Sequence, residues 1–412
     1  MVRTILSSIG ILTVYHLLLA YLGALLYGFP SEKLIVIGVT GTKGKSSTTE
    51  MITAILEEAG YKTALLNSIR IKVGDTSEPN TMRMSMPGRM YIQRFLARAV
   101  SNGCSATVLE MTSEGARQYR HVGISLNALV FTNLAPEHIE SHGSYEAYAD
   151  AKFMLGLSLL KSSKRPRIMI ANAEDAQGAR YLALPVEIPI GFALNNFAPY
   201  ESNDRSGYFT LDTVRIPVML PGDFSLLNGL AAALVTRTLG VPTPVIALAL
   251  GKLTAIAGRA ERIEAGQDFT VIVDYAHTPD SLEALYKAFP MRKVCVLGST
   301  GGGRDTWKRP VMGAKADTYC DHVILTNEDP YDEDPKSIVQ ALAGGMKRKP
   351  EIIMDRREAI AKALSLARTG DAVLITGKGT DPNIAGPNGT KEPWSDAAVT
   401  REEIQKLRNV SV

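Results

Sequence analysis

The chain has 412 residues, of which 45% are hydrophobic and 21% are charged, so it is long enough for roughly two or three folded domains and is not intrinsically disordered. Its 45 basic side chains nearly balance 42 acidic ones, and the net charge of +3 gives no basis for nucleic-acid binding. The three cysteines, Cys104, Cys295 and Cys320, lie far apart, which fits neither a disulfide framework nor a zinc site and suits a reducing compartment.

The N-terminal segment differs in composition from the rest of the chain. Residues 5–27 contain no charged side chain and are rich in Leu, Ile, Ala and Tyr. About 23 apolar residues can cross a bilayer as a helix, so we predict that residues 1–29 form an apolar helix that anchors the chain in a membrane. The alternative is a buried or interfacial helix of a soluble protein, which polar members such as Thr13 and His16 favour.

After Pro30 the sequence alternates between apolar strands and helices. Residues 34–41 form a continuous apolar run, typical of a strand buried on both faces of a parallel sheet, and residues 46–62 are typical of the helix that follows it. This alternation predicts a doubly wound α/β domain. Further strand patterns lie at 62–68, 106–112, 128–134 and 167–173.

A second alternation of strands and helices follows two helical stretches, 225–240 and 243–253. We therefore predict a central ATP-binding domain over residues 30–257 with a parallel sheet, and a smaller Rossmann-like α/β domain over residues 258–412. In this second domain the predicted strands are 269–276, 293–299, 321–327 and 371–377, with a helix at 279–289.

The segment "GVTGTKGKSS", residues 38–47, lies between a predicted strand and a predicted helix. Backbone N–H groups of such a loop cradle phosphate oxygens, while Lys45 would neutralise the β- and γ-phosphates and the Ser46 hydroxyl would bind Mg²⁺. The strict P-loop pattern requires a glycine where this chain has Val39. The predicted ATP-binding residues of the loop are Gly41, Thr42, Lys43, Gly44, Lys45, Ser46 and Ser47.

The spelling T-G-T-x-G-K-S resembles the phosphate loop of the Mur ligase superfamily, which includes the peptidoglycan amino-acid ligases and folylpolyglutamate synthase. The Asp-Tyr-Ala-His-Thr-Pro and Lys-Arg-Pro motifs are most similar to the ligases that add the third residue of the peptidoglycan stem peptide. The other segments that carry the resemblance are "LEMTSEGARQYR" (109–120), "TNLAPEHIESHGSYEAYADAK" (132–152), "GRAERIE" (258–264), "VDYAHTPDSLEAL" (273–285), "GSTGGGRDTWKRPVMG" (298–313) and "LITGKGTD" (374–381).

The resemblance implies amide formation in two steps. A substrate carboxylate attacks the γ-phosphate of ATP to give an acyl phosphate, and an amine then displaces phosphate. It also implies two Mg²⁺ sites, the first held by Ser46 and Glu110 and the second by Glu110 and His138. Arg259 corresponds to an arginine that reaches the γ-phosphate, and Asp274 and His277 correspond to nucleotide contacts, so the expected catalytic residues are Lys45, His138, Lys152 and Arg259.

Lys152 matches the family lysine that CO₂ converts to a carbamate, which would steady the second Mg²⁺. On a helix, Tyr145, Tyr148 and Lys152 share one stripe with Leu155. Burial there lowers the pKa of a lysine, in the direction that carbamate formation requires. The alternative is a lysine that buries its methylene groups and extends its ammonium into solvent.

The expected substrate-binding residues depart from the family pattern. Ligases that add diaminopimelate carry Asp-Asn-Pro-Arg, whose arginine grips the distal carboxylate, whereas this chain has Glu328-Asp329-Pro330-Tyr331. The missing arginine favours an amino acid with a cationic side chain, such as lysine. Lys308 and Arg309 are ranked below Arg304, as a solvated basic pair. The resemblance implies substrate-binding roles for Ser113, Arg120, Arg304, Asp329, Gly377 and Asp381, the last in place of a family glutamate.

The UDP-binding N-terminal domain of stem-peptide ligases is not expected, because fewer than about forty residues precede the phosphate loop. Either the acceptor is not held through UDP, or a partner supplies that contact. One hypothesis is that the apolar helix holds cytoplasmic catalytic domains at the inner face of the cell membrane, where they act on a lipid-linked acceptor. The alternatives are a folylpolyglutamate- or cyanophycin-type ligase and a membrane-tethered P-loop protein without catalytic activity; the oligomeric state stays open.

Overall fold

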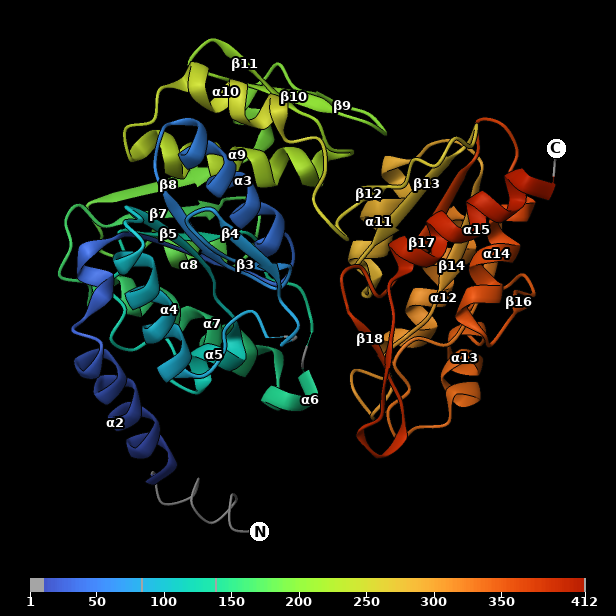
Figure 1. Ribbon diagram of the computed structural model, residues 1–412, viewed down its shortest axis with the longest axis horizontal. Coiled ribbons are helices and arrows are strands. Elements are labelled where there is room, and N and C mark those ends of the chain that lie inside the picture. The colour runs from blue at the N-terminus through green and yellow to red at the C-terminus, as the bar shows by residue number, and fades with distance from the viewer. Residues whose placement is uncertain (1–10, 83, 138, 411–412) are drawn as a thin grey trace.

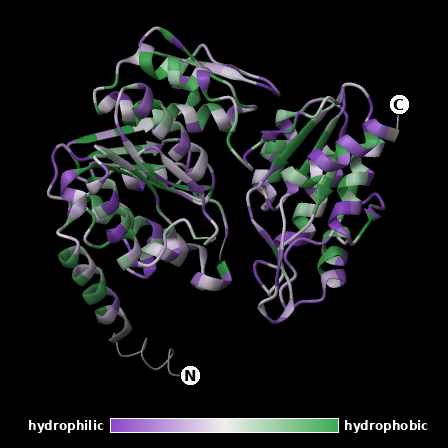
Figure 2. Cartoon of the chain, viewed as in Figure 1, coloured by the Kyte–Doolittle hydropathy of each residue, from purple (hydrophilic) through white to green (hydrophobic). Residues whose placement is uncertain are grey.

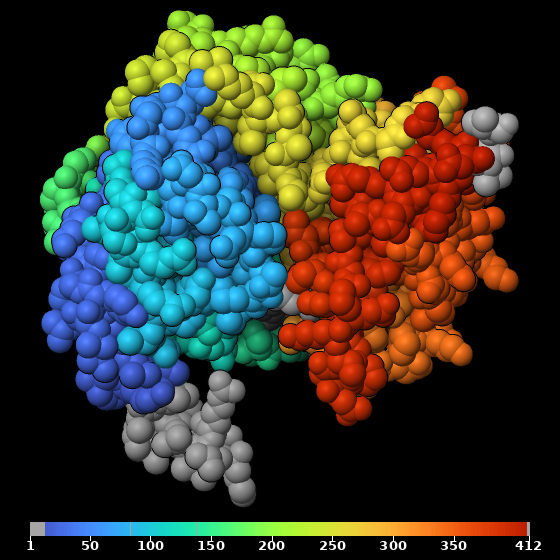
Figure 3. Space-filling view, viewed as in Figure 1, coloured from blue at the N-terminus to red at the C-terminus, as the bar shows by residue number. Residues whose placement is uncertain are grey.

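The computed structural model describes residues 11–82, 84–137 and 139–410. Within these ranges the chain forms two α/β bodies that lie side by side, each built on its own central sheet (Figure 1). The chain crosses from the first body to the second after helix α10 (Thr243–Lys252), and the two bodies touch each other (Figure 3). The predicted α/β fold class is confirmed.

The sheet of the first body has the strand order β4-β3-β2-β5-β1-β6-β7-β8. Neighbours from β2 to β8 in this order are parallel, and β3 and β4 extend one edge as antiparallel strands. Parallel strands are buried on both faces, which explains why the predicted apolar runs coincide with β1, β2, β5, β6 and β7. The strands are β1 (Ile35–Thr40), β2 (Thr63–Leu66), β3 (Arg70–Val73), β4 (Thr76–Pro79), β5 (Ala106–Glu110), β6 (Ala128–Phe131), β7 (Ile168–Asn172) and β8 (Ile188–Phe192).

Several strands of this body were not predicted, because they are short and lack continuous apolar sequence. All residues of β4 are exposed, and β9 has only two residues. β8 has exposed positions at alternate residues, which distinguishes it from the fully buried runs. The small antiparallel sheet consists of β9 (Glu201–Ser202), β10 (Gly207–Leu211) and β11 (Val214–Val218).

Two apolar cores lie on opposite faces of the first sheet. One contains Ile37 and Val39 of β1 under helices α3, α9 and α10, and the other contains Val36 under α4 and α7. Adjacent residues of a strand point to opposite faces, so β1 contributes to both cores. The helices of this body are α2 (Ile11–Leu26), α3 (Lys45–Glu58), α4 (Arg89–Ser101), α5 (Ser113–Arg117), α6 (Ile139–His142), α7 (Tyr145–Leu160), α8 (Gly178–Leu182), α9 (Asp223–Thr238) and α10, with short 3₁₀ helices at Pro30–Lys33 and Leu194–Phe197.

The sheet of the second body has the order β12-β13-β17-β14-β15-β16 and is parallel except for β12. Its strands are β12 (Glu261–Arg262), β13 (Thr270–Asp274), β14 (Lys293–Leu297), β15 (His322–Leu325), β16 (Glu351–Ile352) and β17 (Ala372–Thr376), followed by a hairpin of β18 (Asn383–Ala385) and β19 (Lys391–Pro393). Its helices are α11 (Pro279–Ala288), α12 (Lys308–Tyr319), α13 (Pro335–Ala343), α14 (Arg356–Leu366) and α15 (Asp396–Val410), with a 3₁₀ turn at Pro387–Gly389.

Cys295 and Cys320 form a disulfide, contrary to the expectation from sequence. Cys295 lies in β14 and Cys320 ends α12, and the packing of the helix on the sheet brings their Cα atoms to 6.1 Å. The two cysteines are 25 positions apart, and the sequence between them contains no local pattern that indicates the pairing, because the contact is tertiary. Cys104 is buried and free.

Helix α2 packs against α4 through its smallest residues. Ala20 and Ala24 are fully buried, and a Cβ at Gly23 would lie 2.9 Å from Met90 Sδ. The rest of the helix is largely hydrophobic and exposed (Figure 2). Among the described residues no helix is long and apolar enough to cross a membrane, so the predicted membrane-spanning anchor is not supported; its residues 5–10 lie outside the described ranges.

Candidate active site

The phosphate loop joins β1 to α3 in a conformation that requires glycine at two positions. Gly41 has φ +144°, and Gly44, the N-cap of α3, has φ +81°. A Cβ at Gly41 would lie 1.9 Å from Thr132 Oγ1, and one at Gly44 would lie 2.2 Å from Asn228 Oδ1. The loop therefore packs closely against Thr132 and Asn228 and leads directly into the first turn of α3, where free N–H groups and the positive end of the helix dipole favour an anion.

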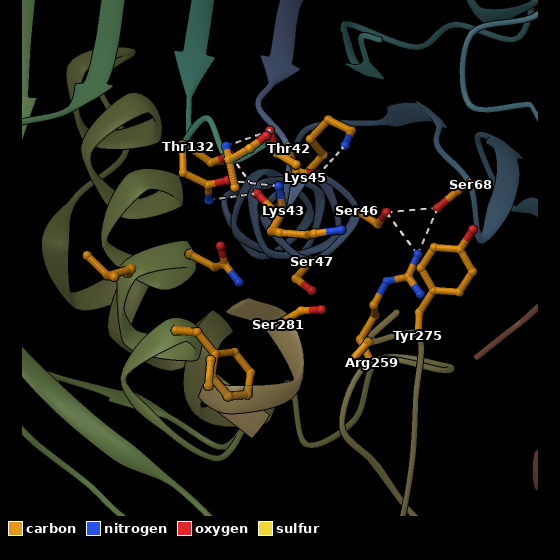
Figure 4. A pocket seen from close by; sticks show the side chains of 18 of the residues that line it. Thr42, Lys43, Lys45, Ser46, Ser47, Ser68, Thr132, Arg259, Tyr275 and Ser281 are labelled. Carbon is orange, nitrogen blue, oxygen red and sulfur yellow. Dashed lines mark hydrogen bonds between the residues drawn. The ribbon is translucent and has the colours of Figure 1, made fainter. Parts of the chain in front are cut away.

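The segment after β6 fixes the phosphate loop. Thr42 N donates to Asn133 O at 2.8 Å, and Lys43 N donates to Asn133 Oδ1 at 2.9 Å. Lys45 Nζ donates to Thr42 O at 2.9 Å, so its ammonium lies against the loop (Figure 4). Asn133 belongs to the "TNLAPEH" segment, and its role as a support of the loop was not anticipated.

Glu110, at the end of β5, accepts hydrogen bonds at both carboxylate oxygens. Its Oε2 accepts from Ser46 Oγ and Ser68 N at 2.9 Å each, and its Oε1 accepts from Ser85 Oγ at 2.9 Å. Burial raises the pKa of Glu110, but Lys45, the Ser68 amide, Arg259 and Ser85 together outweigh burial and hold that pKa below its usual value.

An ionised carboxylate beside a serine hydroxyl offers the hard oxygen donors that Mg²⁺ prefers, so Glu110 and Ser46 fit this ion. Mg²⁺ usually takes one or two protein carboxylates and completes its shell with phosphate and water. Accordingly, the described part of the chain contains no preformed cluster of three or more His, Cys, Asp or Glu side chains around a metal position. His138, predicted as a metal ligand, lies outside the described residues.

Arg259 enters the same site from the second body. Its Nη2 lies 3.0 Å from Ser68 Oγ and 3.3 Å from Ser46 Oγ, and its guanidinium lies 4.5 Å from the ring centroid of Tyr275 (Figure 4). The aromatic ring supports the guanidinium through a cation–π contact. The second body thus delivers a cation to the Ser46–Glu110 pair.

Asp274 holds the turn that carries these residues. Its Oδ2 accepts from Ala260 N at 2.5 Å and its Oδ1 accepts from Ala276 N at 2.6 Å. Burial raises the pKa of Asp274, and these backbone donors oppose that effect. Asp274 therefore ties Ala260, the residue after Arg259, to the loop after β13, and Arg259 and this loop line the cavity.

His277, Glu137 and Lys43 form a charged cluster between the two bodies. His277 Nε2 lies 2.8 Å from Glu137 Oε1, and Lys43 Nζ lies 3.1 and 3.2 Å from the two oxygens of Glu137. Burial lowers the pKa of His277 to about 4. His277 Nδ1 donates its proton to Tyr275 O at 2.7 Å. The contact between Nε2 and Glu137 Oε1 therefore requires a second proton, carried by one of these two atoms.

Lys152 lies behind the phosphate loop and is 2% exposed, so it does not extend its ammonium into solvent. Its Nζ donates to Gly41 O at 2.7 Å and lies 4.9 Å from the ring centroid of Tyr148. Burial and the charge of Lys45 lower the pKa of Lys152 well below its usual value. Of the predicted stripe, Tyr148, Lys152 and Leu155 are buried, and Tyr145 is half-buried.

A second group of buried charges lies at the ends of β15 and β17. Lys378 Nζ donates to Asp329 Oδ1 at 2.8 Å and contacts Asp381 Oδ2 at 3.4 Å. Glu328 Oε1 accepts from Thr300 Oγ1 at 2.9 Å, whereas the buried Oε2 of Glu328 has no hydrogen-bond partner among the described residues. Burial raises the pKa of Glu328 accordingly.

Gly377, directly after β17, packs closely against Glu328. It has φ +110°, and a Cβ there would lie 2.2 Å from Glu328 Oε2. Any side chain would therefore collide with the unpaired carboxylate oxygen. Asp381 lines the cavity, whereas Gly377 and Asp329 do not.

Three further predicted substrate-binding residues, in addition to Gly377 and Asp329, do not line the cavity. Ser113 is buried at the start of α5, and Arg120 donates to Met86 O and, at 2.7 Å, to Gln118 Oε1. Arg304 is exposed, with its guanidinium 5.0 Å from the ring centroid of Tyr331.

The interpretation of Lys308 and Arg309 as a solvated basic pair was wrong. Lys308 is 5% exposed and Arg309 is 3% exposed, and Arg309 pairs with Glu333 at 2.5 Å. Both begin α12, whose first turn packs into the interior, a tertiary arrangement that the basic sequence conceals.

These elements enclose a cavity of about 540 Å³. It is polar at the phosphate loop and apolar at the other end, where Phe192, Leu220 and Phe224 line it. The aromatic residues were missed because Phe192 and Phe224 belong to no predicted motif, and Phe224 directly precedes the predicted helix 225–240. The predicted residues that line the cavity are Thr42, Lys43, Gly44, Lys45, Ser46, Ser47, Glu110, Arg259, Asp274, His277 and Asp381.

Two family models match the chain: the Mur ligase middle domain over residues 39–236, and the Mur ligase glutamate ligase domain over residues 258–379. The UDP-N-acetylmuramyl-tripeptide synthetase of Roseiflexus sp. is 37% identical, over 94% of this chain and 82% of the relative. The UDP-N-acetylmuramoyl-L-alanyl-D-glutamate–2,6-diaminopimelate ligase of Syntrophomonas wolfei is also 37% identical, over 88% and 76%.

Solved structures agree with this assignment. A UDP-N-acetylmuramoyl-L-alanyl-D-glutamate–2,6-diaminopimelate ligase superposes with a TM-score of 0.61 at 27% identity, over 91% of this chain and 79% of that one. The folylpolyglutamate synthase of Mycobacterium tuberculosis, at 16% identity and a TM-score of 0.69 over 94% of each chain, shares the fold. The chain belongs to the Mur ligase family and is an ATP-dependent acid–amino-acid ligase that uses Mg²⁺.

Proposed function

We propose that this ligase joins an amino acid to the carboxylate of a muramyl-peptide acceptor in cell-wall peptide synthesis. The observation that carries this is the convergence of the phosphate loop, the Ser46–Glu110 pair and Arg259 on one cavity. The 37% identity to a tripeptide synthetase supports a third-residue ligase in preference to a folate or cyanophycin ligase. A non-catalytic P-loop protein would not need this array of charged side chains.

In the first step, ATP would lie with its base at the apolar end, near Phe224, and its phosphates at the loop. Lys45 would exchange its bond to Thr42 O for the β- and γ-phosphates, and Arg259 would neutralise charge on the γ-phosphate as the acceptor carboxylate attacks. Mg²⁺ held by Ser46 and Glu110 would supply further charge neutralisation. In the second step the amine attacks the acyl carbon, and phosphate leaves.

We propose further that Lys152 reacts with CO₂ to give a carbamate, with loss of one proton. Its burial supports this, because a neutral amine is the nucleophile and the environment lowers the pKa of Lys152. The product is an anion that reaches further than a glutamate. Together with Glu110 and His138, it would hold a second Mg²⁺.

The amino acid added carries a cationic side chain, in our proposal, and Glu328 recognises it. Of the five carboxylates in the "NEDPYDEDP" segment, Asp329, Asp332, Glu333 and Asp334 accept hydrogen bonds from groups of the chain itself. Glu328 Oε2 is buried without such a partner among the described residues, and Tyr331 stands where an arginine would bind a distal carboxylate. A buried acceptor left unpaired is costly, and an ammonium group would satisfy it.

The test of this function is phosphate release from ATP with pairs of acceptors and amino acids. We expect release only when a muramyl dipeptide acceptor and an amino acid are both present, and faster with lysine than with diaminopimelate. Release with a folate or cyanophycin acceptor alone would contradict the acceptor class. A preference for diaminopimelate would contradict the role of Glu328.

We also propose that the exposed face of α2 contacts the membrane surface, which would bring the site to a lipid-linked acceptor. The small residues Ala20 and Ala24 face α4, which leaves a bulky apolar stripe outward. The helix carries no charge, and the exposed polar residues of neighbouring α4 include Arg94 and Arg98, which suits anionic headgroups. The stripe consists of Val14, Tyr15, Leu18, Tyr21, Leu22, Leu25 and Leu26.

Sedimentation with anionic vesicles tests this attachment. Replacing Leu18, Leu22 and Leu25 with Gln should abolish binding and leave turnover of a soluble acceptor unchanged. The matched control is replacement of Leu157 and Leu248, exposed leucines on other helices, which should change nothing. Equal sedimentation of both variants, or a dimer that the α2 variant dissociates, would contradict membrane contact.

A further inference from the structure

Two arginines of the first body, Arg89 and Arg120, converge on Gln118. Arg89 is the first residue of α4, and Arg120 follows α5. Arg89 Nη2 donates to Gln118 O at 2.7 Å, and Arg120 Nη2 donates to Gln118 Oε1 at 2.7 Å. Both side chains are half-buried. The two guanidinium groups are therefore held close to each other while part of each stays open to solvent.

The charge of this arginine pair is not balanced within the described part of the chain, where neither arginine forms an ion pair. The acidic residue of α5, Glu114, instead contacts Gln118 Nε2 at 2.5 Å and Arg117 Nε at 3.8 Å. Arg89 Nε is buried and has no hydrogen-bond partner among the described residues. Burial, and then the charge of Arg120, lower the pKa of Arg89. These surroundings disfavour two cations by themselves, and an anion between them would relieve the repulsion.

The beginning of α4 adds to the positive potential. Its N-cap, Gly88, makes no side-chain cap hydrogen bond, and its first turn contains no acidic residue. The N–H groups and the dipole of a helix N-terminus favour an anion, and the side chain of a helical residue points back towards that end. Arg89 Nη2 also lies 2.7 Å from His16 Nδ1 of α2, which must accept this hydrogen bond because an arginine can only donate. The contact with α2 thus fixes the Arg89 guanidinium without neutralising it.

The arginine pair lies next to the wall of the active-site cavity. Ser85 lines the cavity and precedes Arg89 on the same segment, and Thr112 lines the cavity and is the N-cap of α5. Helix α5 has five residues, so it is about 8 Å long and separates Thr112 from Gln118 by little more than one turn. An elongated acceptor with its reacting carboxylate in the cavity can therefore place a second anionic group at the arginines.

We propose that Arg89 and Arg120 form an oxyanion site for the diphosphate of the acceptor, and that Arg89 makes the ligase select acceptors that carry this group. The inference rests on the proposed function, because it concerns a muramyl-peptide acceptor. A diphosphate has enough charged oxygens to accept hydrogen bonds from two guanidinium groups at once. Nucleotide-linked and lipid-linked acceptors both contain it. The site would recognise how the acceptor is linked, whereas the cavity receives its carboxylate.

Binding of inorganic pyrophosphate tests the site directly. Isothermal titration calorimetry is performed with the phosphate loop filled by a non-hydrolysable ATP analogue. We expect Arg89→Gln to weaken pyrophosphate by about tenfold or more and Arg89→Lys to restore most of this loss. Arg94→Gln, which removes an exposed arginine of the same helix, is the control and should bind as the unmodified protein does. If Arg89→Gln does not fold, Arg120→Gln removes the other charge and should weaken pyrophosphate similarly.

Two results of the titration would overturn the site: an unmodified protein that does not bind pyrophosphate, and an equal loss of binding in Arg94→Gln.

Turnover then tests selection of the acceptor. KM is compared for one muramyl dipeptide carried on UDP, on a polyprenyl diphosphate and on the free sugar. In the unmodified protein, a diphosphate-linked acceptor should have a KM about tenfold or more below that of the free-sugar acceptor, and Arg89→Gln should remove this advantage. The acceptor that shows the advantage identifies what the diphosphate is attached to. An advantage that persists in Arg89→Gln would contradict the role of Arg89. If no muramyl acceptor is turned over, the proposed function is refuted, and pyrophosphate binding still decides whether the site exists.

Discussion

Glu110 in the first body and Glu328 in the second are both buried carboxylates at strand ends, but their surroundings differ. Glu110 accepts hydrogen bonds at both oxygens, and Lys45 helps hold its pKa below the usual value. Glu328 has one oxygen bound to Thr300 and one without a partner among the described residues, and burial raises its pKa. The hydrogen bonds of Glu110 are therefore already formed in the protein, whereas Glu328 Oε2 is, in our proposal, satisfied by the side chain of the amino-acid substrate.

The largest expected effect comes from removing the charge of the preorganised carboxylate. Glu110→Gln keeps size but loses the anion next to Ser46, so kcat should fall by about 10³-fold, and more Mg²⁺ should be needed for half-maximal rate. Steady-state kinetics over a Mg²⁺ series measures both. Glu50→Gln is the control, because Glu50 pairs with Arg70 outside the cavity and should affect stability without changing Mg²⁺ dependence. If Glu110→Gln leaves the Mg²⁺ dependence unchanged, Glu110 is not a Mg²⁺ ligand, and the contrast drawn between Glu110 and Glu328 is wrong.

The second-largest effect is expected for Lys152→Met, which should reduce activity by about 10²-fold or more, and added bicarbonate should not restore that activity. Methionine fills similar space without a nucleophilic nitrogen. Replacing a buried ammonium with a thioether should leave the thermal midpoint equal or higher. A fully active Lys152→Met would show that the lysine serves only to fill space, and mass spectrometry of the intact protein checks the carbamate directly.

A smaller effect is expected at the unsatisfied carboxylate. Glu328→Gln should raise KM for a cationic amino acid by about 10- to 100-fold, the range for losing a charged hydrogen bond, while KM for ATP stays constant. Asp334→Asn, at the exposed N-cap of α13, is the control for lost charge in the same segment. If both variants raise KM equally, Glu328 has no specific role in recognition.

The smallest effect concerns a buried group to which no ligand is assigned. His121 is 5% exposed, and burial lowers its pKa to about 4. The unfolded chain binds a proton near pH 6.5, so the free energy of unfolding should decline by up to about 3 kcal/mol as pH falls from 6.5 towards 4. His121→Leu should show a smaller decline in chemical denaturation at pH 7.5 and 4.5. If the free energy of unfolding declines equally in His121→Leu and in the unmodified protein, groups other than His121 cause the acid sensitivity.

The parts of the structure that the sequence predicted are those encoded locally. The run 34–41, the phosphate loop and α3 follow one another along the chain, and each has its own pattern of β-branched, glycine or helical residues. The buried stripe with Lys152 was anticipated for the same reason, since it repeats with the period of a helix. Residues 188–218 were missed because their short strands are partly exposed.

The parts that could not be predicted depend on contacts between distant segments. Nothing near Glu137 or His277 indicates that they touch, and nothing in "WKRP" indicates that Lys308 is buried. The disulfide of Cys295 and Cys320 arises from the packing of α12 on β14. The sequence of α2 does not indicate which of its faces α4 covers either, because the helix has no charged residue to mark its exposed face.

The central claim is that the amide forms through an acyl phosphate, and transfer of oxygen tests it directly. The acceptor is labelled with ¹⁸O at its reacting carboxylate, and the phosphate released during ligation is analysed by mass spectrometry. Attack of the carboxylate on the γ-phosphate forms a new P–O bond. The amine then attacks the acyl carbon and displaces phosphate, which breaks the C–O bond. Each released phosphate should therefore carry one ¹⁸O from the labelled carboxylate. Phosphate without ¹⁸O would contradict the mechanism.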